Sequence, residues 1–113
     1  MLERFKVPEQ DRVYVPQERM RAVTEAMFRH NGVSTEDARV SADVLMKNDL
    51  RGNESHGVSN GMPRYVREYG TETINPTPEY KVLRESKTTM TVDADGALGT
   101  HIGPWAMQQA IDR

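Results

Sequence analysis

The sequence predicts an α+β chain, in which an N-terminal helical bundle is followed by a β-hairpin and the start of a further helix. Apolar residues recur at helical spacing as far as Gly70, whereas paired β-prone runs follow only after Pro78. Hydrophobic residues make up 36% and charged residues 28% of the chain, a polar balance that is still typical of folded proteins. A length of 113 residues allows one domain, or one domain and the beginning of another.

The first helix is expected from Pro16 to His30, after an extended arm over residues 1–15 that carries a β-prone run at 13–15. Proline suits the first turn of a helix, because its missing N–H has no intrahelical partner there. Asn31-Gly32 provides the stop, and His30 is expected to interact with the unpaired carbonyls of the last turn. The apolar face is assigned to Met20, Val23 and Met27.

Two more helices are expected before Gly70. The second begins after Ser34, whose hydroxyl can cap the first turn, and ends before Gly52. Because its link to the first helix is short, the two helices are expected to be antiparallel neighbours. The third ends at Gly70, with Pro63 in its first turn and a buried face formed by Met62, Tyr65, Val66 and Tyr69.

The pattern changes after Gly70. Residues 71–78 carry two prolines and read as a linker. The runs 80–83 and 88–92 predict a hairpin, residues 93–99 a glycine-bearing turn, and a helix is expected from Pro104 onward. A hairpin with a barely started helix is marginal alone, so residues 79–113 are expected to open a larger domain. A natural C-terminal helix that frays into solvent is the alternative.

Charge and cysteine usage exclude several classes of protein. The formal net charge is −2 and both signs are interleaved, so no basic patch predicts binding to nucleic acid or to an anionic membrane. Cysteine is absent, which removes disulfides and thiolate metal sites and fits a cytoplasmic protein. The N-terminus has no apolar run of signal-peptide or transmembrane length, so a soluble protein is expected.

The heptapeptide Arg51 to Gly57, RGNESHG, is the leading candidate for a functional site. It gathers a cation, an amide, a carboxylate, a hydroxyl and an imidazole where a helical pattern stops. In irregular backbone, which the two glycines permit, Ser55 and His56 can converge on one ligand. The alternative is a polar loop that follows a helix.

His56 and His101 are the candidate catalytic residues. Both lie in or directly after glycine-bearing turns. An imidazole at such a position suits proton transfer to or from a carbonyl or hydroxyl oxygen. Three scattered histidines without cysteine match no metal-ligand spacing, so no metal site is expected. No nucleophile elbow, phosphate-binding loop or dinucleotide fingerprint is present in the sequence.

Four features in order resemble the N-terminal part of the malate/L-lactate dehydrogenase family. They are DLRGNESHGVSN, a tyrosine-containing helix, INPTP, and TVDADGALG followed by an Ala-Met helix. The family also includes sulfolactate and ureidoglycolate dehydrogenases and cyclic imino-acid reductases. The resemblance covers about residues 16–113.

The resemblance implies a homodimeric oxidoreductase that transfers a hydride between NAD or NADP and a small 2-hydroxy/2-keto or imino acid such as malate or lactate. Residues 1–72 would form a helical substrate-side region, and residues 73–113 the start of a truncated α/β cofactor-binding domain that is not a Rossmann fold. Ser55 and His56 would face the substrate, and His101 would be nearest to the family's proton donor and acceptor.

The chain departs from many relatives at two positions. Asn60 stands where they carry an arginine, four residues after the motif histidine, and Arg64 is the candidate to replace that carboxylate clamp. Thr100 stands directly after the second glycine of the DADGALG turn, where relatives tend to carry His or Gln, so that His101 comes one position late.

A different class of function is the alternative hypothesis. The chain would then be a non-catalytic, truncated remnant or a helical self-association module. The intact Ser-His-Gly turn favours an enzyme, whereas the missing C-terminal part favours the module. Apolar helix faces without their usual cover would promote association.

Overall fold

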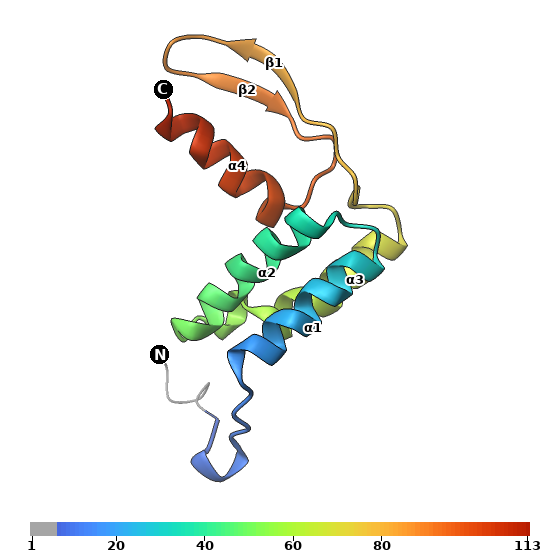
Figure 1. The fold of residues 1–113 in the computed structure, drawn as a ribbon, viewed down its shortest axis with the longest axis vertical. Helices are drawn as coiled ribbons and strands as arrows, with labels where there is room; N and C mark the ends of the chain where they lie inside the picture. Colours follow the sequence, from blue (N-terminus) through green and yellow to red (C-terminus); the bar gives the residue numbers. More distant parts are fainter. Residues whose placement is uncertain (1–6) are drawn as a thin grey trace.

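The computed structural model describes residues 7–113, which form helices and one two-stranded antiparallel sheet (Figure 1). The N-terminal arm and the hairpin lie at opposite ends of a body that measures 54 × 30 × 24 Å. The elements in order are η2 (Glu9–Asp11), α1 (Gln17–His30), α2 (Thr35–Leu50), η3 (Glu54–His56), α3 (Val58–Gly70), β1 (Lys81–Glu85), β2 (Met90–Asp93) and α4 (Gly99–Ile111).

The expected boundaries of α1 and α2 are confirmed, and so is the reason for them. Ser34 Oγ accepts the backbone N–H of Asp37 at 3.1 Å, which satisfies one of the free donors at the start of α2. At the other end, Gly52 has a φ of +73°, the left-handed conformation that glycine adopts most easily just after a helix. Arg21 on α1 and Asp43 on α2 form an ion pair of 3.0 Å between the two neighbouring helices.

The core lies where α1, α2 and α3 meet, around Phe28. Its ring is fully buried, with centroids 6.4 Å from Tyr65 and 6.5 Å from Tyr69. The apolar face predicted for α1 is wrong at Val23, which is 55% exposed, whereas Thr24 is fully buried. A hydroxyl is tolerated in this core because Thr24 Oγ1 donates to the carbonyl of Met20 at 2.8 Å.

The starts expected for α3 and α4 are also wrong, because both helices begin earlier in the chain. Pro63 and Pro104 are each the sixth residue of their helices and do not open them. Near a helix N-terminus, proline removes only one intrahelical hydrogen bond and leaves the remaining turns intact. As a result residues 99–103, expected in a turn or before the helix, are helical.

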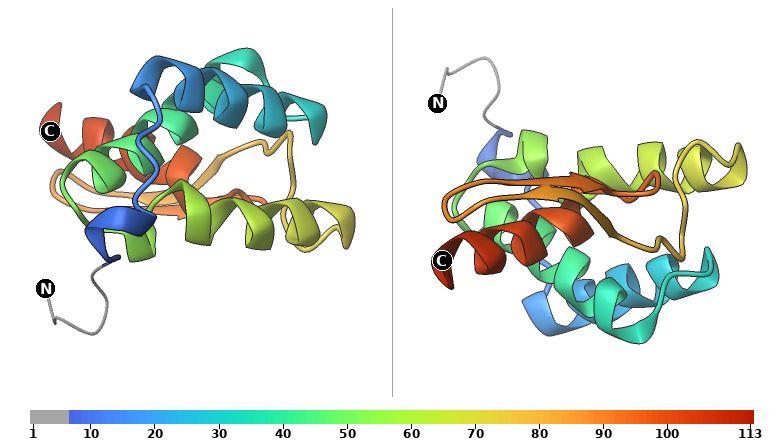
Figure 2. Two further views of the ribbon diagram at one scale, coloured as in Figure 1. Left: turned by 90° about the horizontal axis from the view of Figure 1, so that it is seen from below. Right: turned by 90° about the horizontal axis from the view of Figure 1, so that it is seen from above.

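The hairpin is present, with strand ends that differ from the expectation by about two residues. The turn falls at Ser86–Thr89, where the N–H of Ser86 donates to the carbonyl of Thr89 at 2.8 Å. Figure 2 shows the hairpin running beside α4, and the two are joined by Tyr80 and Trp105, whose ring centroids are 5.2 Å apart. The β-prone run at 13–15 forms no strand, and residues 1–6 of the expected arm lie outside the described residues.

Candidate functional site

A cleft of about 630 Å³ lies where α2, η3, α3 and α4 meet, and it contains the Ser-His pair. We call it the His56 cleft. Its walls are Val44, Leu45 and Asn48 from α2, Ser55 and His56 from η3, Asn60, Gly61, Pro63, Arg64, Tyr65 and Arg67 from α3, and Thr100 from α4. Four of the five predicted site residues therefore share one cavity. They are Ser55, His56, Asn60 and Arg64.

Ser55 and His56 are hydrogen-bonded to each other, with Ser55 Oγ 2.9 Å from His56 Nδ1. Ser55 Oγ also lies 3.2 Å from Asn53 Oδ1. When the ring is an imidazolium, Nδ1–H donates to Ser55 Oγ and the serine hydroxyl donates to Asn53. The other ring nitrogen, Nε2, has no hydrogen-bond partner among the described residues. Nε2 is thus available to take or give a proton.

Two asparagine amides hold the η3 turn from opposite sides. Asn48 Nδ2 on α2 donates to the carbonyl of His56 at 3.1 Å, and Asn60 Nδ2 on α3 donates to the carbonyl of Ser55 at 2.7 Å. These two hydrogen bonds hold the backbone of Ser55 and His56 in place, and so position the imidazole. Asn60, expected to contact substrate, has its amide nitrogen committed to the turn.

Two arginines from α3 line the cleft. Arg64 lies over the ring of Tyr65, with its guanidinium carbon 4.9 Å from the ring centroid, and its Nε is 3.8 Å from Glu68 Oε1. Arg67 forms no ion pair with any described residue. The cleft thus places cationic groups near an imidazole, an arrangement suited to an anionic ligand.

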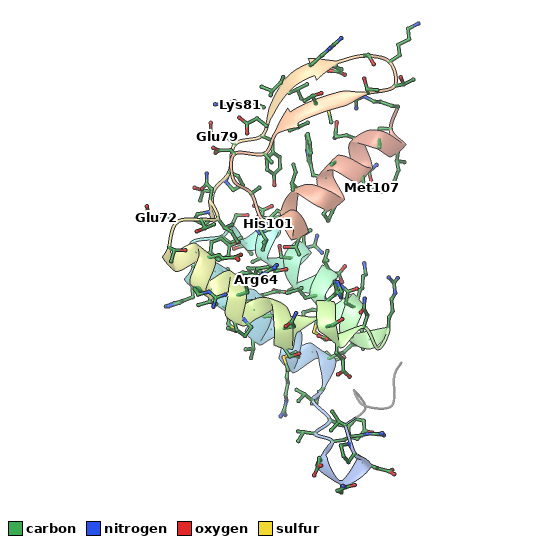
Figure 3. The ribbon with its side chains drawn as sticks, turned by 180° about the vertical axis from the view of Figure 1, so that it is seen from behind. Arg64, Glu72, Glu79, Lys81, His101 and Met107 are labelled. Atoms are coloured by element: carbon green, nitrogen blue, oxygen red, sulfur yellow. The ribbon has the colours of Figure 1, made fainter. Side chains whose placement is uncertain are left out.

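His101 does not reach this cleft. Its side chain is 3% exposed and lies in the core at the inner end of α4, against the edge of Phe28 at 6.3 Å between centroids (Figure 3). Its Nε2 is 3.4 Å from the Tyr69 hydroxyl, and its Nδ1 has no hydrogen-bond partner within residues 7–113. Burial lowers the pKa of this imidazole, against a smaller opposing effect of Asp37. The geometry separates His101 from His56 and favours a structural role.

Thr100, one residue earlier, faces the cleft instead. Because adjacent helical side chains point about 100° apart, Thr100 lines the cleft while His101 enters the core. Thr100 Oγ1 donates to the buried Ser41 Oγ at 3.0 Å. Thr100, which directly follows Gly99, is therefore the residue of this turn that lines the His56 cleft.

Two cleft residues were missed at the level of sequence, Asn48 and Arg67. A signal existed for Arg67, since Asn60, Arg64 and Arg67 follow the i, i+4, i+7 spacing of one helix face. No comparable signal marks Asn48, because its bond to His56 depends on how the chain turns back after α2.

A second hollow of about 710 Å³ lies between the N-terminal arm and the α2–α3 end of the body. Its lining is mainly apolar and includes none of the candidate catalytic residues. Over residues 7–113, no three His, Cys, Asp or Glu side chains come together as a group that could hold a metal ion. None of the helices in this range is long and apolar enough to span a bilayer.

Comparison with known proteins gives a family and relatives of known activity. The sequence pattern of the malate/L-lactate dehydrogenase family matches residues 15–113. L-sulfolactate dehydrogenase of Methanocaldococcus jannaschii is 40% identical over 82 residues, which are 73% of this chain and 24% of that protein. Malate dehydrogenase of Pyrococcus horikoshii is 36% identical over 101 residues, or 89% of this chain and 28% of the relative.

Solved structures agree with these sequence relationships. Malate dehydrogenase from Pyrococcus horikoshii superposes with a TM-score of 0.88 at 36% identity, covering 99% of this chain and 32% of that one. Sulfolactate dehydrogenase from Methanocaldococcus jannaschii superposes with a TM-score of 0.84 at 34% identity, covering 88% and 29%. The chain therefore spans 24% to 32% of the length of these relatives.

Proposed function

The chain belongs to the malate/L-lactate dehydrogenase family, and we propose that it is the N-terminal, substrate-side part of an enzyme that interconverts a small 2-hydroxy acid and its 2-keto acid. An imino acid in place of the keto acid would require the same proton chemistry. The observation that carries the proposal is the Ser55–His56 hydrogen bond of 2.9 Å, which leaves His56 Nε2 available in a cleft lined by arginines.

His56 is assigned the proton transfer. In the direction of reduction, the imidazolium polarises the substrate carbonyl through Nε2–H and gives its proton to the oxygen that becomes the hydroxyl. Ser55 Oγ accepts the Nδ1–H throughout and keeps the ring oriented. In the direction of oxidation, neutral His56 removes the hydroxyl proton at the same atom. Arg64 then binds the carboxylate next to the reacting carbon, because a guanidinium can hold a carboxylate through two hydrogen bonds.

The hydride partner is proposed to be NAD or NADP, which supplies or accepts the hydride when bound. Neither of the glycine-bearing turns that precede α3 and α4 matches a dinucleotide fingerprint. We assign residues 1–72 to the substrate side and residues 73–113 to the start of a non-Rossmann cofactor domain. Homodimer formation and a cytoplasmic location belong to the same proposal.

The test is oxidation of NADH and NADPH by the protein as its gene expresses it, with oxaloacetate, pyruvate and sulfopyruvate as substrates. His56→Ala is expected to lower turnover by about 10²–10⁴-fold, the usual contribution of a positioned acid–base group. His30→Ala, an exposed residue in the last turn of α1, is the matched control and should keep wild-type turnover. Near-normal turnover of His56→Ala would remove His56 from the chemistry.

Self-association without catalysis is the second candidate, and one observation favours it. Val82 and Leu83 on β1 and Met107 and Ile111 on α4 are between 48% and 68% exposed, so the hairpin end carries apolar side chains in water. Sedimentation of the purified chain tests this reading. A clean monomer with a cooperative thermal transition would count against it.

A further inference from the structure

The turn that carries Ser55 and His56 is not held by apolar packing. None of the residues of η3 is buried, and the side chains of the pair are exposed. The N–H groups of His56 and Gly57 donate at 3.0 Å to the carbonyls of Asn53 and Glu54, so these bonds close within the turn itself. The position of His56 relative to α2 and α3 therefore depends on other contacts.

Two carboxamides connect the turn to the helices on either side of it. Asn48 Nδ2 on α2 donates to the carbonyls of Val44 at 3.2 Å and His56 at 3.1 Å. Asn60 Nδ2 on α3 donates to the carbonyl of Ser55 at 2.7 Å. In both amides the nitrogen must face the turn, because a carbonyl oxygen can only accept. We call Asn48 and Asn60 the carboxamide clamp.

Asn60 and Arg64 lie one helical turn apart on α3, and both line the His56 cleft. Another face of α3 is buried in the core through Met62 and Tyr69, which fixes the rotation of the helix. One helix thus carries the guanidinium that is proposed to bind the substrate carboxylate and the amide that holds the turn of His56. The spacing between guanidinium and imidazole is therefore set largely by α3.

We propose that Asn60 is a positioning residue, which acts on the reaction through His56 and not by contact with substrate, and that Asn48 is its counterpart on α2. The sequence predicts a substrate contact for Asn60, whereas its amide nitrogen binds the protein's own backbone. The proposal rests on the proposed function, in which His56 Nε2 transfers the proton and Arg64 binds the carboxylate. Without the clamp the turn moves, so the proton transfer loses its geometry while the substrate keeps its binding group.

Steady-state kinetics separate positioning from substrate contact. The protein as its gene expresses it is assayed with NADH or NADPH and whichever of oxaloacetate, pyruvate and sulfopyruvate it reduces fastest. Asn60→Leu keeps the approximate size of the side chain but has no N–H, and should lower kcat about tenfold or more with KM changed less than about twofold. A substrate contact would instead raise KM. Asn60→Gln, which keeps the amide on a longer side chain, should recover part of kcat.

Asn31→Leu is the matched control for these variants. Asn31 Nδ2 also donates to a backbone carbonyl, that of Met27 at 2.8 Å, but it lies at the end of α1 and outside the cleft. The substitution removes a hydrogen bond of the same kind and should leave kcat and KM at their wild-type values. A loss of kcat in Asn31→Leu equal to that in Asn60→Leu would show that the effect is not specific to the clamp.

A double-mutant cycle tests whether Asn60 acts through the imidazole. In the His56→Ala background, Asn60→Leu should have almost no further effect on kcat, because the remaining turnover no longer uses the group that the clamp positions. Losses that multiply in the double variant would show that Asn60 acts independently of His56, and would overturn the proposal.

NMR relaxation of the ligand-free protein tests the clamp without any assay of activity. The backbone order parameters of Ser55 and His56 should fall in Asn48→Leu and Asn60→Leu and stay unchanged in Asn31→Leu. The thermal midpoint of Asn60→Leu should change little, because the Ser55 carbonyl is exposed and can bind water instead.

The outcomes distinguish this inference from the proposed function. Unchanged order parameters in both clamp variants, or an Asn60→Leu variant whose main change is in KM, would overturn the positioning role. Clamp variants that loosen the turn in a protein that reduces none of the three acids would defeat the proposed function, on which the role in catalysis rests. Wild-type turnover that is insensitive to Asn60→Leu would defeat only this inference.

Discussion

The carboxylate of Asp49 occupies the space that a side chain at Gly57 would need. A Cβ added to Gly57 would lie 1.6 Å from Asp49 Oδ1 and 2.3 Å from its Cγ. Asp49 Oδ2 also accepts the N–H of Val58, the first residue of α3, at 2.9 Å. Gly57 has a φ of −94°, so glycine is required here for space and not for a left-handed backbone. The Asp49 carboxylate therefore both caps the start of α3 and leaves room only for glycine at position 57.

Gly57→Ala is expected to lower the free energy of unfolding by about 2 kcal/mol or more, since the new methyl group must displace a capping carboxylate or the turn itself. Urea denaturation measures the loss, and the amide NMR signals of Ser55 and His56 should shift with it. Gly70→Ala is the control. Nothing lies within 4 Å of a Cβ at this last residue of α3, so the change should be neutral or stabilise by up to about 1 kcal/mol.

A double-mutant cycle isolates the contact. Asp49→Ala alone should cost about 1 kcal/mol through the lost cap on α3. In that background Gly57→Ala should cost far less than in the wild-type chain, because the space is already empty. Additive losses in the double variant would show that the Asp49–Gly57 contact is not the cause.

The boundaries of the first two helices could be predicted from the sequence, because the residues that end these helices are close to them in the chain. Ser34 caps α2 from within its own turn, and Gly52 takes its positive φ directly after the helix. The same local reasoning misplaced the starts of α3 and α4, since Pro63 and Pro104 look like first-turn residues but are tolerated further inside. Local chemistry thus indicated that the helices exist, while their starts depend on packing.

The candidate site was predictable where one turn supplies its residues and not where distant elements meet. Ser55 and His56 are adjacent, so their pairing required no knowledge of the fold. The orientation of His101 depended on whether residues 99–101 are helical, because one residue along a helix separates the cleft from the core. Asn48 reaches the site only because α2 and η3 fold back on each other.

Because Thr100 and Ser41 are hydrogen-bonded, removing the Thr100 hydroxyl alone should cost more stability than removing both hydroxyls. Ser41 is fully buried, and Thr100 Oγ1 at 3.0 Å is its one described hydroxyl partner. Thr100→Val keeps the shape but leaves a buried hydroxyl unpaired, so stability should fall by about 1–3 kcal/mol. Ser41→Ala combined with Thr100→Val should be nearly neutral, because no unpaired group remains. Denaturant titrations of the wild-type chain and the two variants measure this, and a double variant that loses as much as Thr100→Val would contradict the argument.

His101 predicts loss of stability in mild acid. The pKa of this imidazole lies below its ordinary value of 6.5 in the folded chain, because burial disfavours the cation more than Asp37 favours it. As the pH falls below 6.5, the unfolded chain therefore binds a proton that the folded chain resists. This contribution to stability is fully present above pH 6.5 and is lost toward the lowered pKa, by at most about 1.4 kcal/mol per pH unit. The Tyr69 hydroxyl at 3.4 Å from Nε2 carries no charge that could offset this at such pH values, since burial raises its pKa.

His101→Leu removes the titrating group and also the unpaired Nδ1, so the thermal midpoint of this variant should vary less between pH 7 and about pH 5 than that of the wild-type chain. The slope of stability against pH is the readout, which remains valid even when the substitution changes stability at every pH. An unchanged slope in His101→Leu would assign the acid sensitivity to other groups. A flattened slope would show that His101 acts through the core, where its neutral ring stabilises the junction of α4 with α1 and α3.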